Sequence, residues 1–373
     1  MADTPKSGQS EDHHAKPVVV DEAGLKSASA GTAPPRRRSR KILYIAIAAA
    51  VVVVLGLALG LGLGLGLKDH GGRGDENEPS NPTPSEPPVT PNGTVWQPPV
   101  GAKWQIILNS VLDVPSAKDA NAKTSSQPLT PDVPVWDFDM FLHRNTSVIA
   151  NLHALGKRAI CYFSAGSYEP YTPDNTSFVS ADLGKTMDGW PDEKWLDIRR
   201  SSVRNIMLKR LDIAAAMKCD AVDPDNVDGY QNANGLGLTK QDTIDFVRFL
   251  GKEASKRGLA MGLKNAGEVI EDVLDVVQFS VNEQCAQYNE CDTFEKFTAA
   301  GKPVFHIEYP SGAPKAVSTK DSNKLCGATG ADKFSTVLKG MDLDAWVEYC
   351  DGNVAETKVA DTSSGDDNGD DDE

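Results

Sequence analysis

The sequence predicts an α/β protein whose folded part is a (β/α)8 barrel, the TIM-barrel fold. Short apolar runs alternate along the chain with helical patterns, which is typical of a parallel sheet. Residues 101–356, where the composition allows folding, have the usual size of one such barrel. Six successive runs end in polar or charged residues, as barrel strands do when they carry functional side chains to one rim.

Eight apolar runs are expected to form the barrel strands. In chain order they are residues 104–108, 158–163, 194–198, 219–225, 259–264, 276–281, 303–308 and 334–338. Helical patterns lie between them, notably at 201–217 and at 239–257, where Thr239 and Asp242 have the spacing of a capping box. A doubly wound open sheet is the alternative, but no GxGxxG turn follows the first run.

The chain outside the barrel divides into segments of different composition. Residues 1–41 are polar and end in a basic cluster, which predicts a disordered tail. Residues 42–67 carry no charge and exceed the roughly 20 apolar residues that span a bilayer, so they predict a transmembrane signal anchor. Residues 68–100 form a Pro/Gly-rich linker, and residues 357–373 an acidic tail that is expected to be disordered.

The basic cluster before the apolar segment predicts the orientation of the chain. The positive-inside rule puts residues 1–41 in the cytosol and the barrel outside the cell. We therefore expect a single-pass type II protein of the plasma membrane, whose extracellular barrel stays anchored or is shed.

Cysteines and glycosylation sequons agree with an extracellular barrel, because all of them follow the apolar segment. An even number of cysteines in a secreted domain predicts disulfides. The six cysteines are Cys161, Cys219, Cys285, Cys291, Cys326 and Cys350. Several pairings are possible, and the short loop favours Cys285 with Cys291.

No CxxC pair is present, so we expect no metal site and no cofactor. Sequons begin at Asn92, Asn145 and Asn175.

Carboxylates gather where the fourth predicted strand ends, in the segment of residues 222–230. Asp223, Asp225 and Asp228 lie there, beyond a short apolar run. A solvated acidic turn or a Ca²⁺ loop is the alternative, but the EF-hand spacing and its closing Glu are absent. Other predicted strands end near Glu169, Asp197, Lys264-Asn265, Asn282-Glu283 and Glu308-Tyr309. Because barrel strands end at one mouth, this pattern predicts an enzyme.

Paired carboxyl groups at a barrel mouth are typical of enzymes that break glycosidic bonds. No Ser-His-Asp set is credible, since His306 lies inside a predicted strand and no GxSxG elbow is present. Aromatic residues near the predicted rim suit stacking on sugar faces. They are Tyr162, Tyr168, Trp190, Tyr230 and Tyr309.

Five segments, in chain order, resemble glycoside hydrolase family 114, the endo-α-1,4-polygalactosaminidases, and in particular its membrane-anchored fungal members. They are residues 161–169, 195–199, 223–230, 262–265 and 281–285. The resemblance implies a (β/α)8 barrel and a retaining hydrolysis of α-1,4-linked galactosamine polymers. Matched motif by motif, it implies that Asp225 is the nucleophile and Glu283 the acid/base. The residues expected to bind substrate are Tyr162, Ser164, Glu169, Asp197, Asp223, Asp228, Lys264, Asn282, Glu308 and Tyr309.

Charge agrees with this substrate. The formal net charge is −15, and an acidic mouth would attract a cationic galactosamine-containing polysaccharide. Asp223 is the first candidate for a sugar ammonium contact, and acceptance of backbone hydrogen bonds in its turn is the alternative. We expect a monomeric catalytic domain and no nucleic-acid partner. The alternative functions are hydrolysis of another α-galactoside or amino-sugar polymer, and carbohydrate binding without catalysis.

Overall fold

The computed structural model describes residues 95–116 and 129–360. The expected cytosolic tail, residues 1–41, and the expected membrane span, residues 42–67, lie outside the described residues. Within the two described ranges, no helix has the length and apolar character needed to cross a bilayer.

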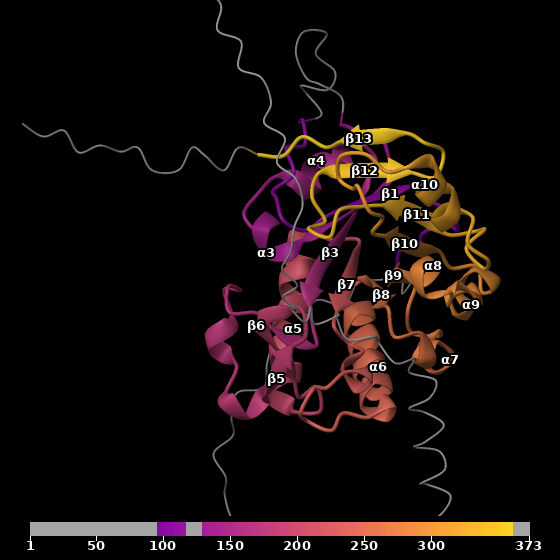
Figure 1. Ribbon diagram of the computed structural model, residues 1–373. Coiled ribbons are helices and arrows are strands. Elements are labelled where there is room, and N and C mark those ends of the chain that lie inside the picture. The colour runs from indigo at the N-terminus through magenta and orange to yellow at the C-terminus, as the bar shows by residue number, and fades with distance from the viewer. Residues whose placement is uncertain (1–94, 117–128, 361–373) are drawn as a thin grey trace, which may run out of the picture. The chain divides into compact units, whose positions relative to one another are not determined.

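A curled sheet with eight parallel strands forms the centre of the described structure (Figure 1). The strands follow one another in chain order. They are β1 (Trp104–Ile107), β2 (Val135–Asp139), β3 (Arg158–Ser164), β7 (Ala221–Asp225), β8 (Ala260–Lys264), β9 (Phe279–Glu283), β10 (Val304–Glu308) and β11 (Ser335–Leu338). The first and last of these strands also meet, since the Trp104 indole N–H donates to the Ser335 carbonyl at 2.7 Å. This arrangement is consistent with a TIM-like barrel.

Two antiparallel strands extend the sheet beyond β11. They are β12 (Trp346–Tyr349) and β13 (Val354–Glu356). The packed chain continues past the expected boundary at residue 356, because Thr357 is buried and Val359 forms a β-bridge with Leu112.

The prediction that residues 194–198 form the third barrel strand was wrong. Residues 194–198 overlap β6 (Trp190–Leu196), which pairs antiparallel with β4 (Ser167–Tyr168) and β5 (Leu183–Met187) in a separate sheet. Met187 pairs with Trp190 across Asp188-Gly189, and Gly189 has a φ of +90°. An Asp-Gly turn between two strands strongly favours a hairpin, so this run pairs with its neighbour in sequence instead of joining the barrel.

The other seven predicted strands overlap parallel strands of the central sheet. The eighth parallel strand is β2, which the sequence analysis missed. From Trp136 to Asp139 its residues alternate between apolar and acidic side chains, a period-two pattern that indicates a strand.

Helices connect the strands, and α6 packs against β8 and α5. The helices are α3 (Met140–His143), α4 (Val148–Ala154), α5 (Ser201–Met217), α6 (Lys240–Lys256), α7 (Ile270–Val273), α8 (Cys285–Tyr288), α9 (Glu295–Ala299) and α10 (Thr319–Cys326). Short 3-10 turns are η1 (Asn175–Ser177), η2 (Ser180–Asp182), η3 (Gly229–Gln231), η4 (Gly267–Val269) and η5 (Cys291–Thr293). The expected capping box is confirmed, because Thr239 and Asp242 each accept from the other's backbone N–H.

All six cysteines are paired in the described structure. The disulfides are Cys161–Cys219, Cys285–Cys291 and Cys326–Cys350, so the expected pairing of Cys285 with Cys291 is confirmed. The first of them joins Cys161 of β3 to Cys219, which lies two residues before β7, the neighbour of β3 in the sheet.

Candidate active site

Asp225, Lys264 and Glu283 lie together because each is the last residue of its strand. β8 lies between β7 and β9, and all three strands run parallel, so their carboxyl ends reach the same edge of the sheet. The Lys264 ammonium lies 2.8 Å from Asp225 Oδ2 and 3.6 Å from Glu283 Oε2. One buried cation therefore links the two carboxylates that the sequence analysis singled out.

Lys264 is almost fully buried. Burial lowers the pKa of its amine, but the neighbouring carboxylates of Asp225, Glu283 and Asp223 outweigh that effect and hold the pKa well above its ordinary value. Lys264 is therefore an ammonium ion at neutral pH. Its nitrogen also lies 5.4 Å from the centre of the Tyr162 ring, within the range of a cation–π contact.

Hydrogen bonds fix both oxygens of the Asp225 carboxylate. The Tyr162 hydroxyl donates to Oδ2 at 3.0 Å, and the Asn226 backbone N–H donates to Oδ1 at 2.6 Å. Burial and the charge of Asp225 raise the pKa of Tyr162, so the phenol keeps the proton that it donates.

The Glu283 carboxylate is fixed in a similar way. Asn265 Nδ2 donates to Oε2 at 3.0 Å, and the Tyr309 hydroxyl donates to Oε1. Asn265 also accepts from the Glu283 backbone N–H at 2.8 Å. Burial and the charge of Glu283 raise the pKa of Tyr309, which keeps this hydroxyl protonated as well.

A left-handed residue follows each of these three strand ends. The φ angles are +61° at Asn226, +47° at Asn265 and +62° at Gln284. Residues other than glycine seldom adopt this conformation, and where they do they tend to cluster at functional sites. These turns direct the Asn226 backbone N–H toward the Asp225 carboxylate and the Asn265 side-chain amide toward the Glu283 carboxylate. The backbone conformation therefore contributes directly to the hydrogen bonds of the site.

Gly166 allows the Asn226 turn to form. A Cβ at position 166 would lie 1.8 Å from the Asn226 carbonyl oxygen, which no side chain can tolerate. The backbone N–H groups of Ala165 and Gly166 also donate to the Asp225 carbonyl, at 2.8 and 3.0 Å.

We therefore expect Gly166→Ala to displace the backbone that carries Asp225. A misplacement of about 1 Å can lower catalytic rates by about 10²-fold, and overpacking costs roughly 1–3 kcal/mol in stability. Thermal unfolding and turnover of glycosidic substrate measure the two effects. Gly340→Ala is the matched control, since a Cβ there would make only ordinary contacts with Pro314, from 3.4 Å. Equal behaviour of the two variants would contradict the expectation.

Two further carboxyl groups lie buried beside the site. Asp137 and Asp223 are fully buried, and within the described structure none of their four carboxyl oxygens has a hydrogen-bond partner. Burial raises the pKa of Asp223 to about 7, with Lys264 opposing the shift and Asp225 and Glu283 adding to it. Burial, followed by the charge of Asp223, raises the pKa of Asp137. Asp223 thus lacks the backbone hydrogen bonds considered for it as a turn residue, and it is shielded from solvent.

Asp223→Asn should stabilise the protein at alkaline pH. Since the folded-state pKa of Asp223 lies above the ordinary value of 3.8, the folded protein binds its proton more tightly than the unfolded chain does. Stability from this group therefore falls as pH rises from about 4 through 7. A neutral amide avoids the cost of the buried charge, which is on the order of 2–4 kcal/mol above pH 7. Melting temperatures at pH 5 and pH 8 test this: the variant should gain more on wild type at pH 8 than at pH 5. A less stable variant at pH 8 would mean that Lys264 holds Asp223 ionised.

Glu169 lies in a second carboxyl pair, with Glu193 of β6. The Tyr171 hydroxyl lies 3.2 Å from Glu169 Oε1 and 3.3 Å from Glu193 Oε1. Burial raises the pKa of Glu169 to about 8, with Arg210 opposing the shift and Glu193 and Asp139 adding to it, which favours the protonated form of Glu169 at neutral pH.

Asp228 is half-buried and shares the electrostatic environment of the central group. Burial and the charge of Asp225 raise its pKa to about 6. Within the described structure its side chain has no salt-bridge partner.

Three other expected substrate-binding residues are buried. Ser164 is buried and accepts from Asn226 Nδ2 at 2.9 Å. Glu308 is fully buried and accepts from the Ala286 backbone N–H at 2.7 Å, which fixes the start of α8. Asn282 is buried and neighbours Glu283 in β9, so its side chain points to the opposite face of the sheet.

Asp197 is not brought to the group around Lys264. It follows β6 of the small sheet, and the Arg199 guanidinium binds its carboxylate at 2.7 and 3.0 Å. Hydrogen bonds from Arg199 lower the pKa of Asp197. Asp197 was expected at the barrel mouth because residues 194–198 were predicted to form a barrel strand, and that prediction was wrong.

Sequence reasoning missed Asp137, Asp139, Tyr171 and Glu193. Asp137 and Asp139 had a signal in the alternating pattern of β2, which places both side chains on one face of the strand. Tyr171 and Glu193 belong to the small sheet and the loop beside it, and no periodic pattern indicates their meeting.

One group of potential metal ligands lies within the described residues: Cys285, Cys291 and His306. Both sulfur atoms are joined in a disulfide, and metal binding requires free thiolates, so this group does not fit a metal ion.

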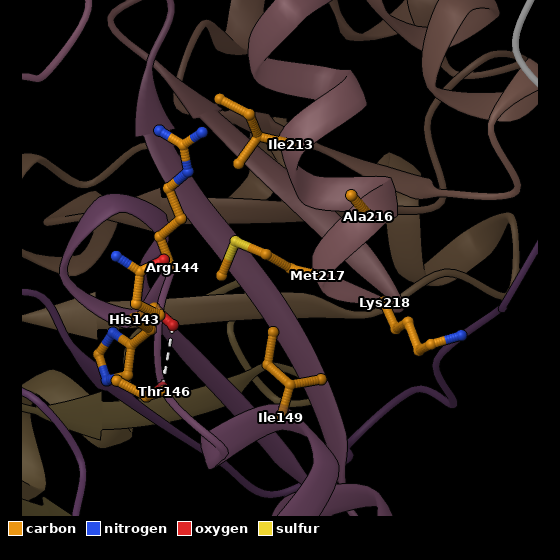
Figure 2. A pocket seen from close by; sticks show the side chains of 9 residues that line it. His143, Arg144, Thr146, Ile149, Ile213, Ala216, Met217 and Lys218 are labelled. Atoms are coloured by element: carbon orange, nitrogen blue, oxygen red, sulfur yellow. Dashed lines mark hydrogen bonds between the residues drawn. The ribbon is translucent and has the colours of Figure 1, made fainter.

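A cavity of about 380 Å³ lies among α3, α4 and α5, and none of the site carboxylates lines it (Figure 2).

Comparisons with known proteins bear on this geometry. A family model described as glycoside-hydrolase family GH114 matches residues 85–355. The crystal structure of Aspergillus fumigatus Ega3 in complex with galactosamine is 50% identical to this chain, covers 69% of it and 98% of its own length, and has a TM-score of 0.62. The glycoside hydrolase domain of PelA from Pseudomonas aeruginosa is 13% identical over 65% of this chain and 96% of that domain, with a TM-score of 0.48. A comparison with curated proteins gave no match.

Proposed function

The chain belongs to glycoside hydrolase family 114, the endo-α-1,4-polygalactosaminidases, and we propose that it cleaves α-1,4-linked galactosamine polymers internally by a retaining mechanism on a closed (β/α)8 barrel. The observation that carries the proposal is the pair of carboxylates held on either side of the Lys264 ammonium.

The spacing of the two carboxylates supports a retaining reaction. Lys264 Nζ lies 2.8 Å from Asp225 Oδ2 and 3.6 Å from Glu283 Oε2, so these oxygens cannot be farther apart than the sum of the two distances. That limit is compatible with the roughly 5–5.5 Å between the two carboxyl groups of retaining enzymes.

In the proposed reaction, Asp225 is the nucleophile. Its carboxylate is held in place by the Lys264 ammonium and by two hydrogen-bond donors, the Tyr162 hydroxyl and the Asn226 backbone N–H. Glu283 donates a proton to the glycosidic oxygen as Asp225 attacks the anomeric carbon, which forms a covalent glycosyl-enzyme. Glu283 then takes a proton from water as the water attacks the same carbon and frees Asp225.

The substrate class follows from charge and from the most informative relative. Ega3 was solved with galactosamine, whose amine is a cation when it is not acetylated. Asp228 offers an unpaired carboxylate close to the reacting pair, and an ammonium near a carboxylate gains Coulomb energy that an acetamido group does not. We therefore propose that deacetylated units are preferred.

The function is tested by incubating the purified protein with galactosamine polymers of known acetylation. Reducing ends and product sizes measure cleavage, and proton NMR of the first products measures their anomeric configuration. Medium-sized oligomers with the α-configuration are expected. Products with the β-configuration would contradict the retaining mechanism. Binding without any cleavage would favour a carbohydrate-binding protein, and cleavage of other α-galactosides alone would favour a different substrate.

We also propose that residues 42–67 anchor the chain in the plasma membrane with a monomeric catalytic domain outside. The support is the sequence: an uncharged segment that follows a basic cluster. Protease added to intact cells should remove the catalytic domain, and a domain that is cut only after permeabilisation would contradict this orientation.

A further inference from the structure

The cavity among α3, α4 and α5 has an apolar lining and a polar rim. Figure 2 shows Met217 between Ile213 and Ile149, with Arg144 and Lys218 on two sides. Ile149 is buried, whereas Ile213 and Met217 are partly exposed. The cavity has a volume of about 380 Å³, which is within the range of small-ligand pockets.

Asn145 lines the same cavity and heads the sequon Asn145-Thr146-Ser147. It is exposed in the turn between α3 and α4. The three disulfides support folding in an oxidising compartment, which is also where sequons are modified.

We propose that Asn145 carries an N-linked glycan whose first N-acetylglucosamine packs into this cavity. The amide nitrogen of Asn145 displaces the lipid diphosphate from C1 of a lipid-linked oligosaccharide. The N–C1 bond forms, the bond from C1 to the diphosphate oxygen breaks, and one amide hydrogen leaves as a proton. The remaining N–H stays on the linkage.

The lining suits such a sugar. A pyranose ring has an apolar face of C–H groups that can lie against Ile213 and Met217. Its hydroxyl and acetamido groups would then lie toward the rim, near Arg144 and Lys218. Within the described residues neither cation has a carboxylate partner, so both can donate to sugar oxygens.

The other described sequon lacks these features. Asn175 lies in η1 and is only partly exposed, and its side-chain amide already donates to the Pro170 carbonyl. We therefore expect high occupancy at Asn145 and lower occupancy at Asn175.

The test uses the full chain made in a eukaryotic secretory host. Peptide mass spectrometry measures occupancy, and melting temperature measures packing. Asn145→Gln and Ser147→Ala each remove the sequon, while Ser147→Thr retains it and is the matched control. We expect the first two to lose the glycan and to melt about 2–4 °C lower, the shift that one modest contact produces in a domain of this size. Trimming of the wild-type glycan to its first sugar should leave the melting temperature unchanged.

A second substitution tests the contact itself. Met217→Ser should lower the melting temperature more in the glycosylated protein than in the Asn145→Gln background, because coupled groups give non-additive effects. An unmodified Asn145 would overturn the proposal. So would a glycan whose loss leaves the melting temperature unchanged, or a Met217→Ser effect of the same size in both backgrounds.

Discussion

Asp225→Asn and Glu283→Gln should each lower kcat by about 10²–10⁴-fold or more while leaving the fold intact. An amide at position 225 is a poor nucleophile and cannot replace the carboxylate that attacks the anomeric carbon. An amide at position 283 cannot carry a proton to the leaving oxygen or take one from water. Turnover of galactosamine polymer measures the loss, and circular dichroism checks the fold.

The two roles can be separated with azide. In Glu283→Ala, azide should attack the glycosyl-enzyme and give the α-glycosyl azide, with the configuration of the substrate. In Asp225→Ala, azide should attack the substrate directly and give the β-glycosyl azide. Asp212→Asn is the control, since Asp212 is an exposed residue of α5. Near-normal activity in either amide variant, or exchanged azide products, would overturn the assignment.

Lys264→Met should lower kcat/KM by about 10²–10³-fold, the loss seen when one preorganised electrostatic group is removed from a catalytic site. Met replaces the length and most of the volume of the side chain but removes the only cation in contact with both carboxylates among the described residues. Without that charge the two carboxylates repel each other, which disfavours the state in which both are ionised.

The pH dependence identifies this effect. Asp225 must be ionised to attack and Glu283 must be protonated to donate, so at least one limb of the kcat/KM profile should move to higher pH in Lys264→Met. Lys252→Met is the control, because Lys252 is an exposed residue of α6. A lower rate with both limbs unmoved would show that Lys264 acts only by packing.

The central residues could be predicted because each of them ends a strand. Parallel strands place their last residues along one edge, so Asp225, Lys264 and Glu283 were expected to meet before any coordinates were known. The direction of a side chain is harder to predict, since a shift of one residue moves it to the other face. Glu308 and Asn282 follow the same strand-end pattern as Glu283, yet their side chains are buried in the surrounding structure.

The small sheet marks the other limit of prediction. The Trp195-Leu196 run has the composition of a barrel strand, and only the Asp-Gly turn before it indicates a hairpin. Tyr171 and Glu193 could not be foreseen as partners because their contact depends on how that hairpin folds back. Asp137 could have been found, since apolar and acidic residues alternate from Trp136 to Asp139.

The three disulfides differ in their access to solvent, and this difference predicts how the enzyme responds to thiols. Cys161, Cys219, Cys285 and Cys291 are buried, whereas Cys350 is exposed and Cys326 is partly exposed. Thiol–disulfide exchange needs a path for the attacking thiolate, so a mild reductant should open Cys326–Cys350 first. The Cys285–Cys291 bond, which begins two residues after Glu283, is protected as long as the protein stays folded. Catalysis should therefore tolerate a reducing medium once folding is complete, while a chain that folds in such a medium never acquires the bond.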